Sequence, residues 1–447
     1  MNEDKKITGF SKLSKTEKIH WLAQNFLYNN PIAVAKDFAS FWHDNIEEQK
    51  LFDGFSENTI TNFYLPFGIA PNFSINGKMY AVPMVTEESS VVAAAANAAK
   101  FWLDRGGFKA KVLNTVKIGQ VHFNYFGDSK KLKSAFPIIK NDLINGCKDL
   151  TANMEKRGGG ILEIELLDMT DKLENYFQLR CSFETCDSMG ANFINSVLER
   201  FGQLLVELIA SNDLFTYQEK DVKVIMCILS NFTPDCVVRA SVECPVKDLG
   251  IIDGMPAQEF AEKFVQAVKI AVVDPYRATT HNKGIMNGID SVVIATGNDF
   301  RAIESCAHTY ASRNGSYSSL SDACIEDGIF KFWIEIPLAL GTVGGLTALH
   351  PLAKKSMELL GMPSASELMM ITATVGLAQN FGAVKALTTS GIQQGHMKMH
   401  LSNIMMSLQA SEEELQKAKE FFKDKAISFN AAREFLTNLR NRAFSIS

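Results

Sequence analysis

The feature that most constrains the fold is a run of small apolar residues, SSVVAAAANAAKFW, between Ser89 and Trp102. A helix with small residues on nearly every face lets neighbouring elements approach closely all round, so we expect it to lie buried at the centre of its domain. Thr86 is placed to cap this helix, with Glu87 and Glu88 in the first turn. The sequence therefore predicts a domain built around one central helix.

The stretch 111–231 has a different pattern, in which strand-like and helix-like segments alternate. We predict strands at 118–123, 161–169, 176–184 and 222–229 and helices at 129–153 and 192–210. The order β-α-β-β-α-β is that of the split β-α-β, ferredoxin-like motif. Because such a unit forms its own antiparallel sheet with two helices on one face, we expect a small domain inserted into a larger one.

The remaining segments return to mixed apolar patterns. We predict strands at 236–242, 291–295 and 330–338, helices at 257–273 and 300–311, and two alanine- and methionine-rich helices ending near residue 387. Capping boxes at Ser14–Glu17 and Ser411–Glu414 mark helices towards both ends. We therefore expect an α+β protein with a large domain at 1–110 and 232–390, a small domain at 111–231 and a helical C-terminal domain at 391–447.

Charge and composition exclude several partners. The 447 residues include 45 Lys and Arg against 50 Asp and Glu, a net charge of −5, so no basic field attracts nucleic acid or anionic lipid. The long uncharged stretch 336–353 contains two prolines and a glycine-rich turn, so we expect no membrane anchor. Eight cysteines without a CxxC pair, and a polar start without signal-peptide character, predict a cytoplasmic protein.

The motifs GxGxxG, GxxxxGK[ST], HExxH and GxSxG are absent from the sequence, and no metal site is expected. Polar clusters at the junctions of predicted elements stand out instead. In the first, PMVTEESS, the acids either complement a helix dipole or take part in chemistry. Because the helix behind them is so apolar, we expect its first turn to start inside the protein, where a carboxyl is suited to act as a general acid.

The second cluster, from 274 to 302, contains Arg277, His281, Asn282, Lys283, Asn287, Asp290, Asn298 and Asp299. These are either loop residues beside a solvated lysine or parts of a site. Asp299 ends a predicted strand that begins just after the lysine loop, so we expect Lys283 and Asp299 to meet. A lysine held by a carboxylate is a fixed positive charge suited to stabilising an oxyanion.

Two further clusters are rich in glycine. The triglycine 158–160 and the segment CDSMGAN, which opens a helix, offer backbone N–H groups to a pyrophosphate, while Glu163 can hold a ribose hydroxyl. The segment GIQQGHMKMH contains His396 beside a glycine. Such a histidine is either structural or a proton donor that closure of a flap delivers.

These clusters, in this order, resemble the class II (bacterial) form of 3-hydroxy-3-methylglutaryl-coenzyme A reductase. The matching pieces are ENTITNFYLPFGIAPNFSINGKMYAVPMVTEESSVVAAA, RGGGILEIE, DSMGAN, DPYRATTHNKGIMNGIDSVVIATGNDFRA, GTVGG and GHMKMH. The resemblance implies a large domain around a buried central helix, an inserted ferredoxin-like cofactor domain and a C-terminal helical flap.

The resemblance also implies roles for individual residues. The catalytic positions are matched by Glu88, Lys283, Asp299 and His396, the hydroxymethylglutaryl-binding positions by Ser90, Arg277 and Asn287, and the dinucleotide-binding positions by Glu163, Asp187, Met189, Gly190 and Asn192. This chain has Ser188 where the family pattern DAMG has alanine, and Glu163 where a shorter aspartate suits the ribose diol. A carboxylate there repels a 2′-phosphate, which slightly favours NADH over NADPH.

The implied reaction is the NAD(P)H-dependent, four-electron reduction of hydroxymethylglutaryl-CoA to mevalonate and CoA, a step of isoprenoid biosynthesis, or the reverse oxidation. Lys283, oriented by Asp299, would stabilise the oxyanion. His396 would protonate the CoA thiolate, and Glu88 would supply a proton during formation or reduction of the aldehyde. The family's active site lies at a dimer interface, so we expect a homodimer or a multiple of dimers.

Two other classes of function stay open. A CoA-thioester acyltransferase or lyase would need an activated thiol, for which Cys186 at the start of a helix is the candidate. A non-catalytic homologue would keep the fold for binding alone. Occupation of all four catalytic positions by the expected residue types argues against the second alternative.

Overall fold

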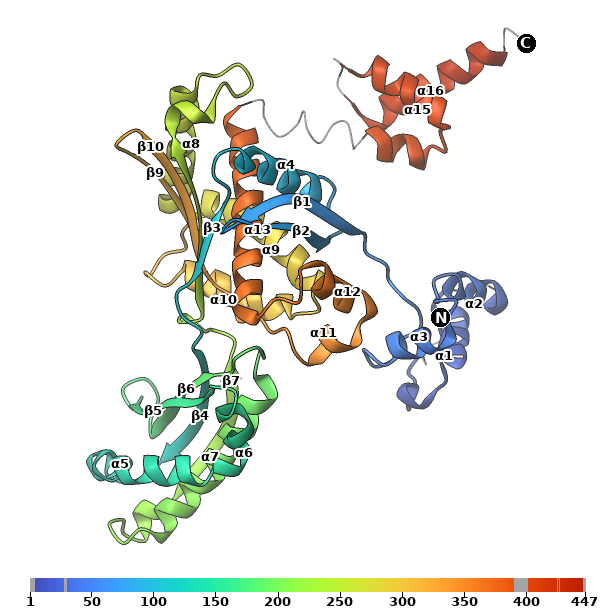
Figure 1. The fold of residues 1–447 in the computed structure, drawn as a ribbon. Coiled ribbons are helices and arrows are strands. Elements are labelled where there is room, and N and C mark those ends of the chain that lie inside the picture. Colours follow the sequence, from blue (N-terminus) through green and yellow to red (C-terminus); the bar gives the residue numbers. More distant parts are fainter. Residues whose placement is uncertain (1–4, 28–29, 390–400, 424, 426, 445–447) are drawn as a thin grey trace. The chain divides into compact units, whose positions relative to one another are not determined.

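The computed structural model describes residues 5–27, 30–389, 401–423, 425 and 427–444 (Figure 1). The chain divides into two compact units, the first ending at Pro66 and the second beginning at Phe67. Within the described ranges the buried apolar side chains form separate clusters, one in the first unit and three in the second. No helix in these ranges has the length and apolar character needed to cross a bilayer.

The first unit contains α1 (Lys15–Leu22), α2 (Pro31–Ala39) and α3 (Ile46–Asp53). The capping box predicted at the start of α1 is confirmed, because Ser14 Oγ accepts from the Glu17 N–H while the Ser14 N–H donates to the Glu17 carboxylate. Ile19, Ala23 and Val34 form the small buried cluster of this unit. Apolar periodicity and capping therefore account for its helices.

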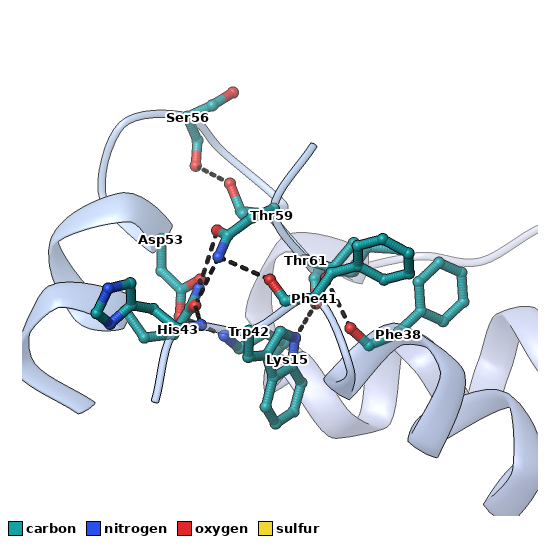
Figure 2. Close-up of polar contacts among 12 residues, drawn as sticks. Lys15, Phe38, Phe41, Trp42, His43, Asp53, Ser56, Thr59 and Thr61 are labelled. Carbon is teal, nitrogen blue, oxygen red and sulfur yellow. Dashed lines mark hydrogen bonds and ion pairs between the residues drawn. The ribbon is translucent and has the colours of Figure 1, made fainter. Parts of the chain in front are cut away.

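Figure 2 shows how the segment after α3 is tied to the helices of the first unit. The Thr61 hydroxyl donates to the carbonyl of Phe38 at 2.7 Å, and the indole N–H of Trp42 donates to the carbonyl of Ile60 at 2.9 Å. Lys15 Nζ lies 2.5 Å from Asp53 Oδ2 and 4.4 Å from the centre of the Trp42 ring. These side chains hold an irregular segment in place without strand pairing.

The larger portion of the second unit combines a hairpin, a sheet and helices. Its elements are β1 (Phe67–Ile75), β2 (Lys78–Val85), α4 (Val91–Leu103), β3 (Lys109–Val112), β8 (Val237–Pro245), α8 (Ala257–Val273), α9 (Pro275–Ala295), α10 (Phe300–Ala311), β9 (Ser321–Glu326), β10 (Ile329–Pro337), α11 (Gly345–Leu349), α12 (Pro351–Leu359) and α13 (Ala365–Thr388). The strands β1 and β2 pair with each other, and β3, β8, β10 and β9 form an antiparallel sheet in that order.

Helix α13 is the buried centre of this portion, since every residue from Ile371 to Phe381 is buried. A Cβ on Gly376 would lie 2.7 Å from Ile289 of α9, so the glycine is needed for the close approach of α9 and α13. The prediction that the alanine-rich helix is the buried centre is wrong. In α4, Ala93 and Asn97 are exposed, because the small side chains of this helix border a cleft instead of a neighbouring helix on that face.

The smaller portion, inserted between β3 and β8, has its own core. Its elements are β4 (Lys117–Tyr125), α5 (Ser129–Asn145), α6 (Lys148–Glu155), β5 (Gly160–Asp168), β6 (Tyr176–Glu184), α7 (Ala191–Ser211) and β7 (Val222–Ser230). The antiparallel strand order β5-β6-β4-β7 matches the predicted β-α-β-β-α-β arrangement. The helix predicted at 129–153 is two helices, since α5 ends at Asn145 and α6 begins at Lys148.

The predicted bounds of α8 and α10 are confirmed residue for residue. The predicted strand at 291–295 is wrong, because α9 continues through these β-branched residues to Ala295. Asp274 caps α9 and Pro275 occupies its first position, and packing against α13 then outweighs the local strand preference. Towards the C-terminus, α15 (Glu412–Phe421) begins with the predicted capping box, and α16 (Phe429–Phe444) follows.

Candidate functional site

A cleft of about 640 Å³ lies among α4, α9, α13 and the turn that joins β2 to α4. Its lining includes six residues that were singled out from the sequence: Glu88, Ser90, Arg277, His281, Lys283 and Asn287. The small side chains of α4, such as Ala94, leave the space open. Parts of the sequence that lie nearly 200 residues apart therefore meet around one cavity.

The polar centre of the cleft is the carboxylate of Glu88. Lys283 Nζ lies 2.6 Å from Glu88 Oε2, and Asn287 Nδ2 donates to the same oxygen at 3.3 Å. Lys283 and Asn287 are one helical turn apart on α9, so both side chains point to one side of that helix. The side chain of Lys283 is 58% exposed and that of Glu88 39%, so a ligand in the cleft can reach both.

The turn before α4 explains how Glu88 reaches α9. The prediction that Thr86 caps the helix and Glu88 lies in its first turn is wrong, because α4 begins only at Val91. Thr86 Oγ1 instead accepts from the Glu88 N–H at 3.2 Å, and Ser90 takes a left-handed conformation with φ 76°. This turn directs the Glu88 side chain towards α9 instead of along α4.

Arg277 lies further back on α9 and also lines the cleft. Burial lowers the pKa of its guanidinium, which nevertheless stays charged at neutral pH. Beside it, burial and the charge of Arg277 lower the pKa of His281 to about 3, so this histidine is neutral. His281 Nε2 lies 2.7 Å from Ser321 Oγ, whose hydroxyl donates to Asn380 at 2.8 Å. Arg277 is therefore a second cation that α9 presents to the cleft, besides Lys283.

Asp299 does not meet Lys283 within the chain, contrary to the sequence prediction. Its carboxylate caps α10, accepting from the N–H groups of Arg301 and Ala302, and forms an ion pair with Arg301 at 2.9 Å. The prediction failed because α9 is a continuous helix. The twelve residues from Lys283 to its end rise about 18 Å, so Asp299 follows at the far end.

The segment DSMGAN forms the start of α7 and touches the larger portion. Asp187 makes two hydrogen bonds to the larger portion. Its backbone carbonyl accepts from the Thr342 N–H at 2.8 Å, and its carboxylate accepts from the Ala365 N–H at 2.7 Å. Gly190 has φ 88°, and a Cβ there would lie 2.4 Å from Thr185. No side chain caps α7, so the first-turn amides near Asn192 are available to an anion.

Around Met189 and Glu163 the contacts are of different kinds. A Cβ on Gly341 would lie 2.6 Å from the backbone nitrogen of Met189, so the GTVGG turn approaches this loop closely. Glu163 on β5 is paired with Lys140 of α5, and this hydrogen bond lowers the pKa of Glu163. The lysine offsets the negative charge on which the sequence argument for NADH depends.

His396 lies outside the described residues, as does the rest of the segment GIQQGHMKMH. Cys186, the candidate thiol of the alternative functions, donates from Sγ to the carbonyl of Arg157 at 3.3 Å. Burial and the neighbouring acids Glu184 and Asp187 raise the pKa of Cys186, which disfavours the nucleophilic thiolate. In the ranges that the structure covers, no group of histidine, cysteine and acidic side chains could hold a metal ion.

Sequence analysis missed the contribution of α13 to the cleft. Gln379 and Asn380 are buried and line it, although they stand in an otherwise apolar helix. The signal was the amide pair itself, because two adjacent polar side chains in the middle of such a helix need partners inside the protein. Asp290 belongs to the polar cluster 274–302, but no role was predicted for it.

Comparisons with known proteins find one family. Residues 17–401 match the family model described as hydroxymethylglutaryl-coenzyme A reductase. The chain is 35% identical to 3-hydroxy-3-methylglutaryl-coenzyme A reductase of Archaeoglobus fulgidus, over 98% of this chain and 95% of the relative. It is 32% identical to a probable reductase of the same name from Borreliella burgdorferi, over 91% of each.

Solved structures point the same way. The class II 3-hydroxy-3-methylglutaryl-CoA reductase of Streptococcus pneumoniae, bound to NADPH in open conformations, superposes with a TM-score of 0.70 at 37% identity, over 89% of this chain and 96% of that one. A second structure of the reductase from this organism gives a TM-score of 0.70 at 36% identity, over 97% and 99%. The mixed α/β fold thus matches class II structures.

Proposed function

Because the chain belongs to the hydroxymethylglutaryl-coenzyme A reductase family, and is thus an oxidoreductase, we propose that it reduces hydroxymethylglutaryl-CoA to mevalonate and CoA in the cleft described above. The observation that carries this proposal is the contact of Lys283 and Asn287 with the carboxylate of Glu88 inside that cleft. Converting a thioester into a primary alcohol and a free thiol takes two hydrides and two protons. The chain must therefore stabilise an oxyanion and deliver protons twice.

Lys283 is the group proposed to stabilise the oxyanion. When the thioester carbonyl carbon accepts a hydride, its oxygen becomes negative, and an ammonium held in place beforehand stabilises that charge without reorganisation. Glu88, 2.6 Å away, keeps Lys283 oriented and is positioned to give a proton to the oxygen of the aldehyde. Asn287 fixes the Glu88 oxygen that faces Lys283.

Arg277 and Ser90 are proposed to hold the hydroxymethylglutaryl group. The free carboxylate of that group is a planar anion, which a guanidinium binds through two parallel hydrogen bonds. Arg277 lines the same cleft and is partly buried, so its charge is poorly screened by solvent. Ser90, on the turn beside Glu88, offers a hydroxyl donor nearby.

A reduced nicotinamide cofactor, when bound, supplies the hydrides. The start of α7 suits the pyrophosphate of this cofactor, because the amides of its first turn have no side-chain cap. Only glycine fits at position 190 in this turn, since a Cβ there would clash with Thr185. We propose that the loop of Asp187, Met189 and Gly190 with Asn192 holds the pyrophosphate and that Glu163 approaches the ribose. The pairing of Glu163 with Lys140 weakens the case for NADH, so NADH and NADPH are tested side by side.

We propose that 111–231 is the inserted ferredoxin-like cofactor domain, 1–110 with 232–390 the large domain, and 391–447 a helical flap that brings His396 to the CoA thiolate. A cytoplasmic enzyme suits the eight cysteines, all of which are free. We also propose a homodimer or a multiple of dimers with the active site at the interface. The separation of Asp299 from Lys283 within one chain supports this, because Asp299 could then reach the lysine of a second copy.

The test is the absorbance of the reduced nicotinamide with purified protein and hydroxymethylglutaryl-CoA, run in parallel with NADH and NADPH. We expect about two cofactors oxidised per CoA released, following the two-hydride stoichiometry, and a loss of about 100-fold or more in Lys283→Ala. Lys263→Ala, at an exposed position of α8, is the matched control and should keep full activity. Oxidation of neither cofactor would leave a binding role, and loss of turnover in Cys186→Ala would favour thiol chemistry.

A further inference from the structure

A second ionisable group lies on the stripe of α9 that carries Lys283 and Asn287. Asp290 follows them at the spacing i, i+4, i+7, so the three side chains leave the helix on one face. Asp290 does not line the cleft. It faces α10, where its side chain pairs with that of Glu304. Its other carboxyl oxygen, Oδ1, is buried and has no hydrogen-bond partner among the described residues.

Glu304 connects Asp290 to a short chain of polar groups. Glu304 Oε2 lies 2.6 Å from His308 Nε2, and His308 Nδ1 lies 2.7 Å from the hydroxyl of Tyr317. Of the described charged groups, only Glu304 acts on Asp290. On the neighbouring helix α13, the residues facing this part of α9 are neutral, such as Val375, Gly376 and Gln379.

Two carboxyl groups in this position cannot both be ionised. Burial, with the hydrogen bond and charge of Glu304 added, raises the pKa of Asp290 to about 9. The hydrogen bond from His308 lowers the pKa of Glu304. The two shifts have opposite directions, and together they favour a proton on Asp290, whose O–H can then donate to the Glu304 carboxylate.

Asp290 belongs to α9 and Glu304 to α10, so their pairing spans the hairpin that these two consecutive, contacting helices form. The turn of the hairpin carries Asp299, whose carboxylate caps α10. The turn is fixed further, since the Gly341 N–H donates to Asn298 at 2.8 Å and the Thr347 hydroxyl donates to the carbonyl of Thr296 at 2.9 Å. Lys283 and Asn287 on one arm and Asp299 at the turn are thereby held in one rigid element.

We propose that Asp290 is a positioning residue of the reductase, whose neutral carboxyl, hydrogen-bonded to Glu304, fixes the α9–α10 hairpin and with it the geometry of Lys283, Asn287 and Asp299. The inference rests on the proposed function. Loss of the proton would place two carboxylates in contact and force the arms of the hairpin apart. The amide of asparagine can replace the neutral carboxyl as a donor, whereas alanine cannot.

The experiment compares kcat and KM of the wild type, Asp290→Asn and Asp290→Ala from neutral to alkaline pH. Asp290→Asn should keep kcat within about twofold at neutral pH, while its alkaline fall should begin about one pH unit higher than in the wild type. Asp290→Ala should lose about tenfold in kcat with little change in either KM, as expected for a group that acts through others. Asp142→Asn, at an exposed position of α5, is the matched control.

Infrared spectroscopy separates this inference from the proposed function. At slightly alkaline pH the wild type and Asp142→Asn should show the carbonyl stretch of a protonated buried carboxyl, and Asp290→Asn should lack it. An identical alkaline limb in the wild type and Asp290→Asn, or no carboxyl difference between them, would overturn the positioning role. An inactive wild type that still shows the band would contradict the reductase assignment while leaving the protonated pair intact.

Discussion

Helix α9 carries one member of each of two ionisable pairs, and the pairs differ in their surroundings. Lys283 and Glu88 have opposite charges and face an open cleft, where a ligand can come between them. Asp290 and Glu304 would both be negative in water, and we propose that behind the cleft they hold one proton between them, since Asp290 Oδ1 is buried and the pKa of Asp290 is raised. The open pair, Lys283 with Glu88, has the accessibility that chemistry needs. The enclosed pair, Asp290 with Glu304, is named for the buried Oδ1 of Asp290, and the desolvation of Asp290 favours its neutral, hydrogen-bond-donating form.

The difference shows how one helix can combine reactivity with rigidity. A surface ion pair contributes little to stability because solvent screens it, so Glu88 and Lys283 can be separated by substrate at small cost. A hydrogen bond from the Asp290 carboxyl to Glu304 is a short-range contact that fails if either helix moves. The enclosed pair therefore suits a structural role, and the open pair a chemical one.

The largest expected effect comes from breaking the open pair. Glu88→Gln should lower kcat by about 100-fold or more, because the amide cannot supply a proton, while the free energy of unfolding changes by less than about 0.5 kcal/mol. Steady-state kinetics and denaturant titration measure the two quantities. A variant that loses stability together with activity would show that Glu88 is structural.

Arg277 tests whether the cleft of the open pair binds the substrate. Arg277→Ala should raise the KM for hydroxymethylglutaryl-CoA by about 10- to 100-fold, since a charge-assisted hydrogen bond contributes about 1.5–3 kcal/mol. The KM for the cofactor should stay the same. Arg277→Lys keeps the charge but loses the paired geometry, so it should fall between the wild type and alanine. Equal effects on both KM values would place Arg277 outside the substrate site.

The enclosed pair should reveal itself through the pH dependence of stability. The pKa of Asp290 is 3.8 in the unfolded reference and raised to about 9 in the fold, so the stability that its protonated form contributes is complete below pH 3.8 and is lost as pH rises to about 9. The loss is at most about 1.4 kcal/mol per pH unit.

Asparagine at position 290 does not titrate. The free energy of unfolding of Asp290→Asn, relative to wild type, should therefore increase between about pH 6 and about pH 8 in denaturant titrations. Asp142→Asn should follow the wild type at both values. Parallel curves for wild type and Asp290→Asn would mean that Asp290 is ionised in the fold.

Sequence patterns predicted most local structure, because apolar periodicity and caps act within a few residues. The bounds of α8 and α10 and the capping boxes at Ser14 and Ser411 came from such signals. The β-branched run at the end of α9 gave a false strand, since its conformation is decided by packing against α13. Local signals failed where a tertiary contact competed with them.

The site was predictable as a set of residues but not as a geometry. Polar clusters at element junctions pointed to Glu88, Lys283 and Asn287, which the fold brings together. The expected contact of Lys283 with Asp299 rested on the false strand and was lost with it. The pairing of Asp290 with Glu304 had no sequence signal, because a shared proton depends on desolvation by elements distant in the chain.

A third ionisable pair, Lys140 with Glu163, gives the smallest expected effect on stability and activity of the three pairs. Lys140 and Glu163 lie on the surface of the inserted portion, with side chains 29% and 54% exposed, so solvent screens them. Glu163→Gln should change the free energy of unfolding by no more than about 0.5 kcal/mol. The ratio of the KM values for NADH and NADPH should change by less than about threefold, because Lys140 already offsets the charge.

The variant Lys140→Met makes this prediction decisive. It leaves Glu163 unpaired, so a 2′-phosphate nearby should be repelled and the KM for NADPH should rise relative to that for NADH, by roughly the three- to fivefold that ~1 kcal/mol of screened repulsion gives. The double variant Lys140→Met with Glu163→Gln should return the ratio to the wild-type value. If neither single change alters the ratio, Glu163 lies away from the ribose, and cofactor choice is decided by other residues.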